Sequence, residues 1–111
     1  MNSLKNRVQL IGRLGADPEV KQVNGDRTLT KFSIATNETF NNAAGEKVEE
    51  TQWHHIVAWG KIGEIAGKYL KKGKEVAIEG KLIHRQYESN GEKRYFTEVS
   101  MNEMLMVGVK D

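Results

Sequence analysis

One segment of this 111-residue chain spaces its apolar residues differently from the rest, and it restricts the fold more than any other feature. In KIGEIAGKYLKKG, residues 61–73, apolar side chains recur at i, i+3, i+4, i+7 and i+8, which predicts one amphipathic helix. These side chains are Ile62, Ile65, Ala66, Tyr69 and Leu70. We expect Gly73 to cap the helix, with Lys71 and Lys72 in its last turn, where the helix dipole favours cations.

Two glycines inside this predicted helix oppose its formation. Gly63 and Gly67 each cost about 1 kcal/mol relative to alanine in a helix interior. We therefore expect both glycines to lie where the helix packs closely against another element.

The remaining chain consists of β-strand patterns separated by turns. The expected long strands are Arg7–Leu14, Thr28–Thr36, Thr51–Trp59, Lys74–Tyr87 and Arg94–Met101, with a short extended piece at Glu19–Val23 and a last short strand at Met104–Val107. The polar segment Asn37–Glu50 is consistent with a long loop or a flexible hairpin, and Ser89–Glu92 with a hairpin turn. Strand periodicity predicts the all-β class. One helix between the third and the fourth long strand is the layout of the OB-fold, a five-stranded Greek-key barrel, here with an extended β-hairpin. The choice of this barrel rests partly on the position of the helix and partly on the family resemblance described below.

Composition excludes several classes of protein. Seventeen Lys and Arg oppose 15 Asp and Glu, so the net charge of +2 alone is weak evidence for a polyanionic partner. Cysteine is absent, which excludes disulfides and thiolate metal sites. No apolar run approaches the roughly 20 residues of a membrane span. The start, MNSLKNRVQL, lacks the apolar core of a signal peptide, so we expect a cytoplasmic protein.

Motifs for catalysis are missing from the sequence. It contains no G-x-S-x-G, no P-loop ending and no G-x-G-x-x-G. His54 and His55 are neighbours on a predicted strand and point to opposite faces, and His84 is remote, so a shared metal is not expected. We expect no enzyme, no cofactor and no metal. A nuclease or hydrolase would need a nucleophile or metal constellation that we do not find.

The strand Thr51–Trp59, TQWHHIVAW, indicates binding instead. Alternation places Trp53 and Trp59 on one face, and Ile56 and Ala58 on the other, where they suit a core. Outward tryptophans on a small barrel indicate a partner surface. A β-bulge in this strand would change the division. Of the other aromatic residues, we expect Phe32, Tyr69 and one of Tyr95 and Phe96 to lie in the core.

Basic charge is concentrated near these aromatic residues. Lys61–Lys74 holds five Lys against one Glu, and Lys81–Arg94 holds four basic residues against two acidic ones. Aromatic rings that stack on bases, together with cations that meet phosphates, are typical of proteins that bind single-stranded nucleic acid. Reading of a duplex groove is not expected, because the apolar face of the helix is committed to the barrel.

Four stretches resemble the bacterial-type single-stranded DNA-binding proteins across almost the whole chain. They are NRVQLIGRLGADPEV, FSIATNETF, GEKVEETQWHHIVAWGKIGEIAGKYLKKGKEVAIEGKL and KRYFTEV. The resemblance implies an OB-fold that coats single-stranded DNA in replication, repair and recombination, as a homotetramer without a membrane association. It implies base-stacking positions at Phe40, Trp53, Trp59 and Tyr87, phosphate-binding positions at Arg7, Lys61, Lys72 and Arg85, and a subunit-interface position at His54.

The chain departs from that family in three places. Phe40 and Tyr87 stand where many members have Trp, and Trp59 stands where Phe is common. The end, MLMVGVKD, lacks the long tail with an acidic tip through which members recruit other proteins. Either the sequence is cut before such a tail, or this is a short member that coats DNA without that route of recruitment. We expect one DNA-binding domain over residues 1–108, a short end over 109–111 and, from this chain, no recruitment through a tail. The alternative is a related OB-fold subunit, a primosomal or RNA-binding accessory protein.

Overall fold

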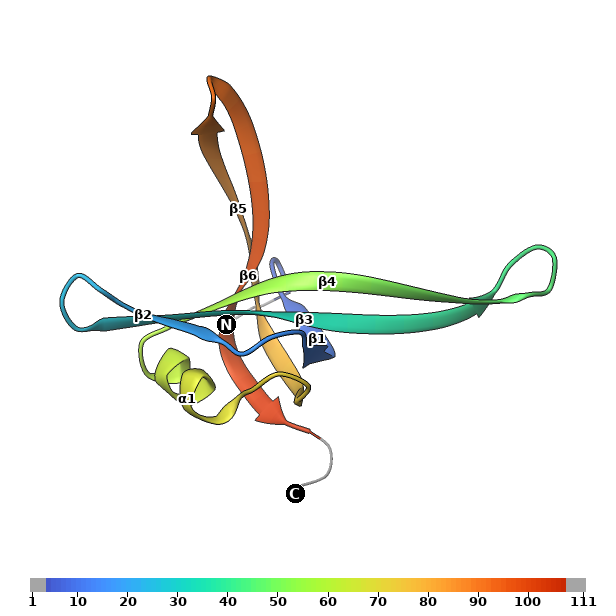
Figure 1. The fold of residues 1–111 in the computed structure, drawn as a ribbon, viewed down its shortest axis with the longest axis horizontal. Helices are drawn as coiled ribbons and strands as arrows, with labels where there is room; N and C mark the ends of the chain where they lie inside the picture. The colour runs from blue at the N-terminus through green and yellow to red at the C-terminus, as the bar shows by residue number, and fades with distance from the viewer. Residues whose placement is uncertain (1–3, 108–111) are drawn as a thin grey trace.

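The computed structural model describes residues 4–107 of the chain (Figure 1). In chain order its elements are β1 (Val8–Leu14), β2 (Glu19–Val23), β3 (Arg27–Asn41), β4 (Lys47–Trp59), α1 (Lys61–Tyr69), β5 (Glu75–Ser89) and β6 (Glu92–Met106). Five strands follow the order β1-β5-β6-β4-β3, and a β1–β3 pairing closes them into a barrel, while β2 extends the sheet beside β3. The β4–β6 pair is parallel and the others are antiparallel. The expected five-stranded barrel, with its helix between the third and fourth barrel strands, is confirmed.

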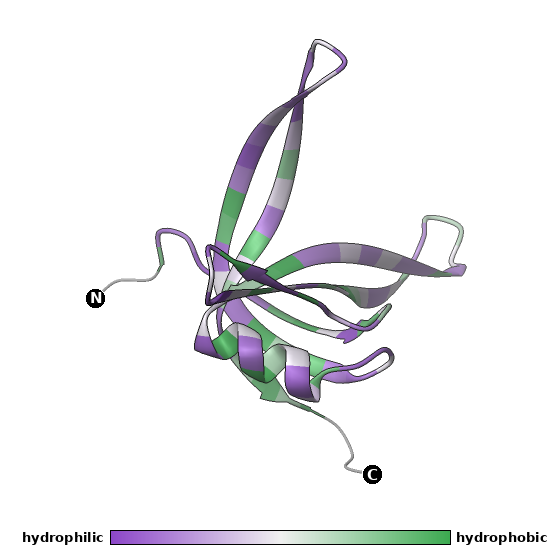
Figure 2. Ribbon diagram, turned by 60° about the vertical axis from the view of Figure 1, so that its left-hand side comes forward, coloured by the Kyte–Doolittle hydropathy of each residue, from purple (hydrophilic) through white to green (hydrophobic). Residues whose placement is uncertain are grey.

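The barrel encloses one apolar core. The helix α1 packs against β3 and β4 and contributes Ala66 to this core. The buried cluster consists of Leu14, Phe32, Ile34, Ile56, Ala58, Ala66, Leu70, Val76, Ile78, Val99 and Met101. Figure 2 shows apolar residues gathered in the barrel and α1, and mostly hydrophilic residues toward the ends of the hairpins. The core therefore lies at the foot of the hairpins and leaves their outer parts for other contacts.

Two long hairpins, β3–β4 and β5–β6, extend from the barrel in different directions (Figure 1). Residues 37–50, for which we expected a loop or a hairpin, form the hairpin. Strands β3 and β4 pair without interruption from Leu29 with Trp59 to Asn41 with Lys47. The turn is held by Asn42, whose side-chain oxygen accepts the N–H groups of Ala44 and Glu46, both at 2.9 Å. The observed strand β3 (Arg27–Asn41) is thus longer than the predicted strand Thr28–Thr36.

Three details of the helix differ from the prediction. The helix ends at Tyr69, and Gly73 lies three residues beyond the extended Leu70 cap, with φ 88° in a separate turn. Leu70 is buried in the core, and its extended backbone conformation ends the helix. Ile65 and Tyr69 are 37% and 49% exposed, so they do not belong to the packed face.

The packed face of α1 instead includes Gly63. A Cβ atom on Gly63 would overlap the carbonyl oxygen of Ala58, and one on Gly67 would lie 2.6 Å from a methyl group of Val20. The expected close packing of both glycines is confirmed. The Oγ1 atom of the buried Thr30 donates a hydrogen bond of 2.6 Å to the Gly63 carbonyl and fixes α1 on β3.

The C-terminal strand is continuous, although two separate strands were expected. Gly80 pairs with Met101 and Glu79 with Glu103, so Asn102 has no partner in β5 and forms a bulge. A Cβ atom on Gly80 would overlap the carbonyl oxygen of Ser100, which explains the glycine at this crossing. The predicted gap between Met101 and Met104 is therefore a local irregularity in one strand.

The prediction of which aromatic residues lie in the core is only partly correct. Phe32 is buried, whereas Tyr69 is exposed on α1. Tyr95 and Phe96 are 73% and 37% exposed, so neither belongs to the core. Both lie on the part of β6 that pairs with β5 beyond the barrel, where no second layer covers the hairpin in the described residues.

Gly63→Ala is expected to destabilise the protein, although alanine ordinarily stabilises a helix by about 1 kcal/mol over glycine. The added methyl group meets backbone of β4, which cannot move aside, and overpacking of this kind costs about 1–3 kcal/mol. Gly67→Ala is the matched control, because its methyl group meets a side chain of the edge strand β2. Thermal unfolding should give a lower Tm for Gly63→Ala than for Gly67→Ala. Equal values would contradict this packing.

Candidate nucleic-acid interface

The two faces of β4 are divided as its alternation predicted. Trp53 is 56% exposed, whereas Ile56 and Ala58 are buried in the barrel. The uninterrupted pairing of β4 with β3 contains no bulge that would exchange the faces. Val57 shares the face of Trp53 but is buried, because it lies at the floor of a groove.

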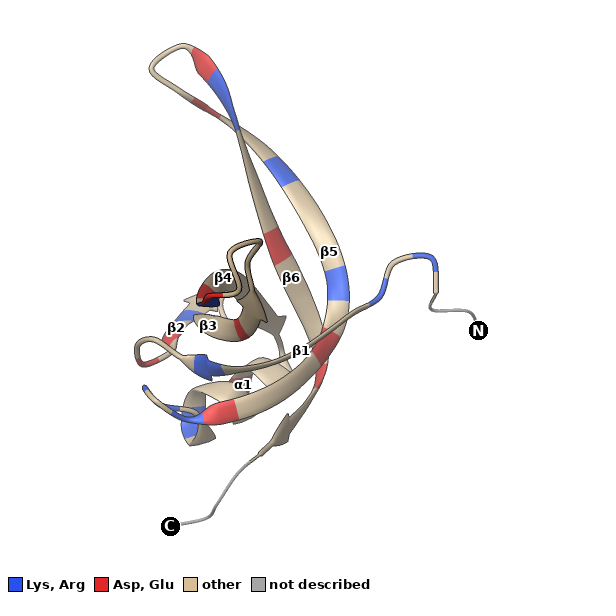
Figure 3. Ribbon diagram, turned by 90° about the vertical axis from the view of Figure 1, so that its right-hand side faces the viewer, with Lys and Arg blue, Asp and Glu red and all other residues tan. Residues whose placement is uncertain are grey.

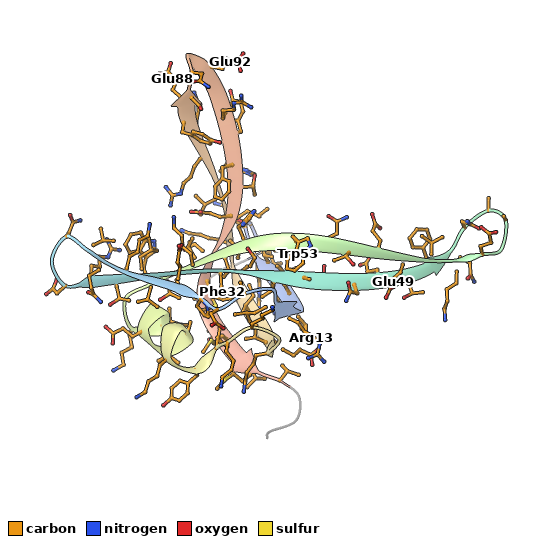
Figure 4. All side chains as sticks on the ribbon, in the orientation of Figure 1. Arg13, Phe32, Glu49, Trp53, Glu88 and Glu92 are labelled. Carbon is orange, nitrogen blue, oxygen red and sulfur yellow. The ribbon has the colours of Figure 1, made fainter. Side chains whose placement is uncertain are left out.

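This groove, of about 730 Å³, runs along the outer surface of the barrel. The β1–β2 connection, β2, β3, β4 and β6 form it. Its lining includes Gly15, Asp17, Glu19, Lys31, Ser33, Trp53, His55, Val57, Phe96 and Glu98. Figure 4 labels Trp53 on β4, above Phe32 of the barrel. The groove therefore combines aromatic rings and charged groups on an open surface.

Trp53 rests directly on the backbone of Gly15. A Cβ atom on Gly15 would lie 2.6 Å from Cζ3 of the indole, so any larger residue would displace the ring. The N–H of Gly15 donates to the carbonyl oxygen of Ser33 at 3.2 Å, which holds this connection against β3. The contact leaves the other side of the indole available to a ligand.

His55 and Phe96 form an aromatic pair in the groove. Their ring centroids are 5.1 Å apart and the rings are inclined by 38°. The Nδ1 atom of His55 lies 3.3 Å from the Oγ atom of Ser33. Phe96 was not among the predicted site residues. Phe96 points into the groove because it pairs with Arg85. The adjacent aromatic residues Tyr95 and Phe96 do not show by sequence alone which of them points there.

The remaining predicted stacking residues are distributed over β4 and both hairpins. Trp59 is half-buried, and the Arg27 guanidinium lies 4.3 Å from the centroid of its ring. Tyr87 is exposed on the same face of its hairpin as Phe96, because it lies two residues from Arg85.

Phe40 occupies a different surface from Trp53. It is exposed and pairs with Val48 near the end of the β3–β4 hairpin. By alternation it points to the face of this ribbon opposite to Trp53. The structure therefore brings Trp53 close to His55 and Phe96, and places Phe40 apart.

The predicted phosphate-binding residues also differ in their surroundings. Arg85 contacts the buried Glu98, with 2.6 Å between Nε and Oε2. Lys61 and Lys72 are exposed, and the backbone N–H of Lys72 donates to Asp17 at the groove, at 2.9 Å. Figure 3 shows basic residues on β5 where the hairpin leaves the barrel. Lys72 and Arg85 thus contact Asp17 and Glu98 of the groove lining, whereas Lys61 lies on α1, which contributes no residue to that lining.

Arg7 lies elsewhere on the surface. Its guanidinium forms an ion pair with Glu79, with 3.0 Å between Nε and Oε2. Glu79 lines a second depression, on the outer face of β1, β5 and β6, together with Ile11 and Leu105. Arg7 is therefore outside the aromatic groove.

His54 lies on the inward face of β4, at the end of the barrel. It is half-buried, and its Nε2 atom is 2.9 Å from Oγ1 of Thr36. Its partner across the sheet is Ile34, which in turn pairs with Leu14 of β1. His54 is thus set beside the point where β1 joins β3, and apart from the groove.

Residues 4–107 contain neither a cluster of metal ligands nor a membrane-spanning helix. No group of three or more His, Asp or Glu residues there is arranged to hold a metal ion. No helix within that range is long and apolar enough to cross a membrane. Residues 109–111, for which we expected a short end without a tail, lie outside the described residues.

A closed, mixed barrel with one helix and an aromatic groove on its outer strands defines the chain as an OB-fold protein. More particularly, it belongs to the Single-strand binding protein family, which it matches over residues 5–107. The members of this family are non-enzymatic, in agreement with the expectation from the sequence.

Individual relatives agree with this assignment. The chain is 45% identical over 108 residues to Single-stranded DNA-binding protein 1 of Chlorobaculum tepidum, covering 96% of this chain and 67% of the relative. It is 46% identical over 104 residues to the single-stranded DNA-binding protein of Neisseria meningitidis, covering 93% and 60%. The chain thus spans roughly two thirds or less of the length of these relatives.

A solved structure has nearly the same fold. It is described as Plasmodium falciparum SSB in complex with ssDNA, and it superposes with a TM-score of 0.88 at 33% identity. The match covers 97% of this chain and 98% of the other. The barrel and both hairpins therefore belong to the shared architecture.

Gly15→Ala is expected to displace the Trp53 indole without unfolding the barrel, because Gly15 is exposed and its methyl group would meet only the ring. In a Trp59→Phe background, Trp53 is the single tryptophan, so its emission reports the ring directly. The emission maximum should shift relative to the Trp59→Phe parent, while far-UV circular dichroism stays the same. Unchanged emission would show that Gly15 does not position the ring.

Proposed function

We propose that this chain binds single-stranded DNA with little regard to sequence, and coats and protects it during replication, repair and recombination. The observation that carries the proposal is the exposed Trp53 in a groove on the outer strands of an OB barrel. The similar Plasmodium falciparum protein, described in complex with ssDNA, supports it. On this proposal the protein works in the bacterial cytoplasm, at the nucleoid.

Stacking on aromatic rings explains tolerance of sequence, because every base presents a π-face. Trp53, Trp59 and Tyr87 each leave ring surface open on β4 or the β5–β6 hairpin, and Phe40 does so on the β3–β4 hairpin. Phe40 lies on another face of its ribbon, so it would bind a part of the strand that passes outside the groove. A long DNA would then follow the barrel and both hairpins.

Cations at the edges of the groove would hold the phosphates. Lys61 and Lys72 are exposed, and by neutralising phosphates they would release the counterions that are condensed on the DNA. Arg85 is half-exposed and directed by Glu98. Arg7, paired with Glu79 on the other outer face, would contact DNA only where the strand continues around the protein.

Two surfaces support assembly into the expected homotetramer. Within the described residues, β1 from Val8 to Gly12 pairs with β5 on one side, and its other edge is open to a second copy. On the outer face of β1, β5 and β6, Ile11, Ala77 and Leu105 lie in one row across three strands. Ile11 and Leu105 are 59% and 69% exposed, as expected for an apolar surface that another subunit covers.

His54 fits an interface at the first of these surfaces. Its partner Thr36 follows Ala35, the residue that pairs with Arg13 as β1 enters the barrel. A second copy that pairs with the open edge of β1 would come close to both side chains.

Trp53→Ala is expected to weaken binding of fluorescently labelled oligo(dT) while the circular dichroism spectrum stays unchanged. Loss of one stacking contact costs about 1–3 kcal/mol, a range already established for single-stranded DNA-binding OB-folds of this same class, or roughly a 5- to 150-fold rise in Kd. Tyr69→Ala is the matched control, because Tyr69 is 49% exposed, close to the 56% of Trp53, but lies on α1.

The outcome of this titration separates the alternatives. Failure of the unmodified protein to bind, or equal binding to duplex, would overturn the proposal. Competition between DNA and RNA oligomers of equal length tests the alternative function, a primosomal or RNA-binding accessory subunit. Such a subunit should prefer RNA, or bind neither DNA nor RNA tightly.

Leu105→Glu is expected to reduce the oligomeric mass measured by light scattering after gel filtration, because it places a charge in the apolar row of β1, β5 and β6. Tyr69→Glu is the control, since Tyr69 is half-exposed on α1, outside that face. A tetramer that persists in Leu105→Glu would show that this face does not join subunits.

A further inference from the structure

The contact between His55 and Phe96 joins two strands at the point where they separate. Strands β4 and β6 pair only at Ile56 with Val99 and at Val57 with Ser100 in the described residues. Beyond that point, β6 leaves the barrel with β5, and the two rings meet across the gap with centroids 5.1 Å apart. The contact forms part of the groove wall.

The rings keep surface open to solvent. His55 is exposed and Phe96 is 37% exposed, although each contacts the other. His55 is also oriented by its contact with the Oγ atom of Ser33, at 3.3 Å. The pair is thus held in place before any ligand arrives, and part of its aromatic surface faces the groove.

The charges of the groove select which part of a nucleic acid can enter it. Its lining contains the carboxylates of Asp17, Glu19 and Glu98, and one lysine, Lys31. Carboxylates on the wall repel phosphates, whereas an uncharged base avoids this repulsion. Arg85 stands beside Glu98 on the hairpin, so a cation is available at the edge. The wall therefore favours bases inside the groove and the backbone along its rim.

Trp53 lies next to the His55–Phe96 pair on the outer face of β4. Trp53 and His55 are two residues apart on one face, about 6.6 Å along the strand. A flexible strand of DNA with one base on Trp53 can bring the next base onto the neighbouring rings.

From these observations we propose that His55 and Phe96 form one additional base-stacking site, adjacent to Trp53, which takes an unpaired nucleobase of single-stranded DNA. The proposal rests on the function proposed above and adds two residues to it, neither of which the sequence predicted as a stacking position. Phe96 supplies the main ring surface, and His55 holds that ring against the barrel.

Substitutions at two adjacent residues test the site. Phe96→Leu removes the ring, and Phe96→Tyr keeps it. Tyr95→Leu is the matched control, because Tyr95 is more exposed, pairs with Gln86 and points to the other face of the hairpin. Phe96→Leu should raise the Kd for oligo(dT) about 5-fold or more, the lower end of the range for one stacked base. Phe96→Tyr and Tyr95→Leu should each change it less than about 2-fold.

The salt dependence of binding distinguishes stacking from loss of charge. Phe96→Leu should leave the slope of log K against log salt unchanged, since no phosphate contact is removed. Thermal unfolding should show the same Tm for Phe96→Leu as for the unmodified protein, because the ring is outside the core.

Photo-cross-linking gives evidence that a purely structural role of Phe96 would not produce. Oligo(dT) that carries 5-iodouracil should form an adduct with Phe96 or His55, identified by peptide mass spectrometry, and Phe96→Leu should remove the Phe96 adduct. If Phe96→Leu melts at a lower temperature, its binding data alone do not test the site, and the cross-link in the unmodified protein is the test. If neither Phe96 nor His55 forms an adduct there, the proposed site is wrong.

The proposed site and the proposed function can fail separately. If the unmodified protein does not bind oligo(dT), both are wrong. If it binds, and Trp53→Ala weakens binding but Phe96→Leu does not, the additional site is wrong and the function stands. Equal losses in Phe96→Leu and Tyr95→Leu also overturn the site, because they indicate a general effect on the hairpin.

Discussion

The short pairing between β1 and β3 closes the barrel, and the arrangement of the rest depends on it. Arg13 pairs with Ala35 and Leu14 with Ile34, and the adjacent Gly12 is so close to Ala35 that a Cβ atom would overlap its carbonyl oxygen. Closure turns one face of every barrel strand inward. The inward face of β4 then belongs to the core, and its outward face, with Trp53, becomes the floor and wall of the groove.

Closure also explains why the hairpins are free to extend. The core ends where β1 leaves β3, so residues beyond Ala35 on β3 and before Trp53 on β4 have each other as partners and little else. On the other side, β6 leaves β4 after two parallel pairs. The protein therefore has a small packed centre, and Phe40, Tyr87, Phe96 and Arg85 are carried on strands that continue out of it.

Local periodicity in the sequence was sufficient for the all-β class and for the exposed position of Trp53, whereas the particular barrel was predicted partly from the position of the helix and partly from the family resemblance. Alternation along residues 51–59 and the helical spacing after Lys61 are properties of single segments. The turn of the β3–β4 hairpin was harder to recognise, because it is stabilised by the side chain of Asn42 and its strands are polar. The helix face was misjudged because glycines, which carry no apolar side chain, occupy part of the packed surface.

Features that depend on register between distant strands could not be predicted. Phe96 faces the groove because it pairs with Arg85, and a shift of one residue would have placed Tyr95 there instead. The ion pair of Arg85 with Glu98 follows from the same register, whereas the position of Arg7 beside Glu79 depends on the pairing of β1 with β5. Alternation along a strand establishes which residues share a face, and pairing between strands decides what that face meets.

The ion pair between Arg85 and Glu98 has a consequence for how a phosphate would be held. Glu98 is buried and occupies the Nε side of the guanidinium, so Arg85 cannot turn freely as a lysine would. Its terminal nitrogen atoms remain donors for a second anion. One arginine can thus bind the protein and the DNA backbone at once, and the direction in which it presents its charge is determined before the DNA arrives.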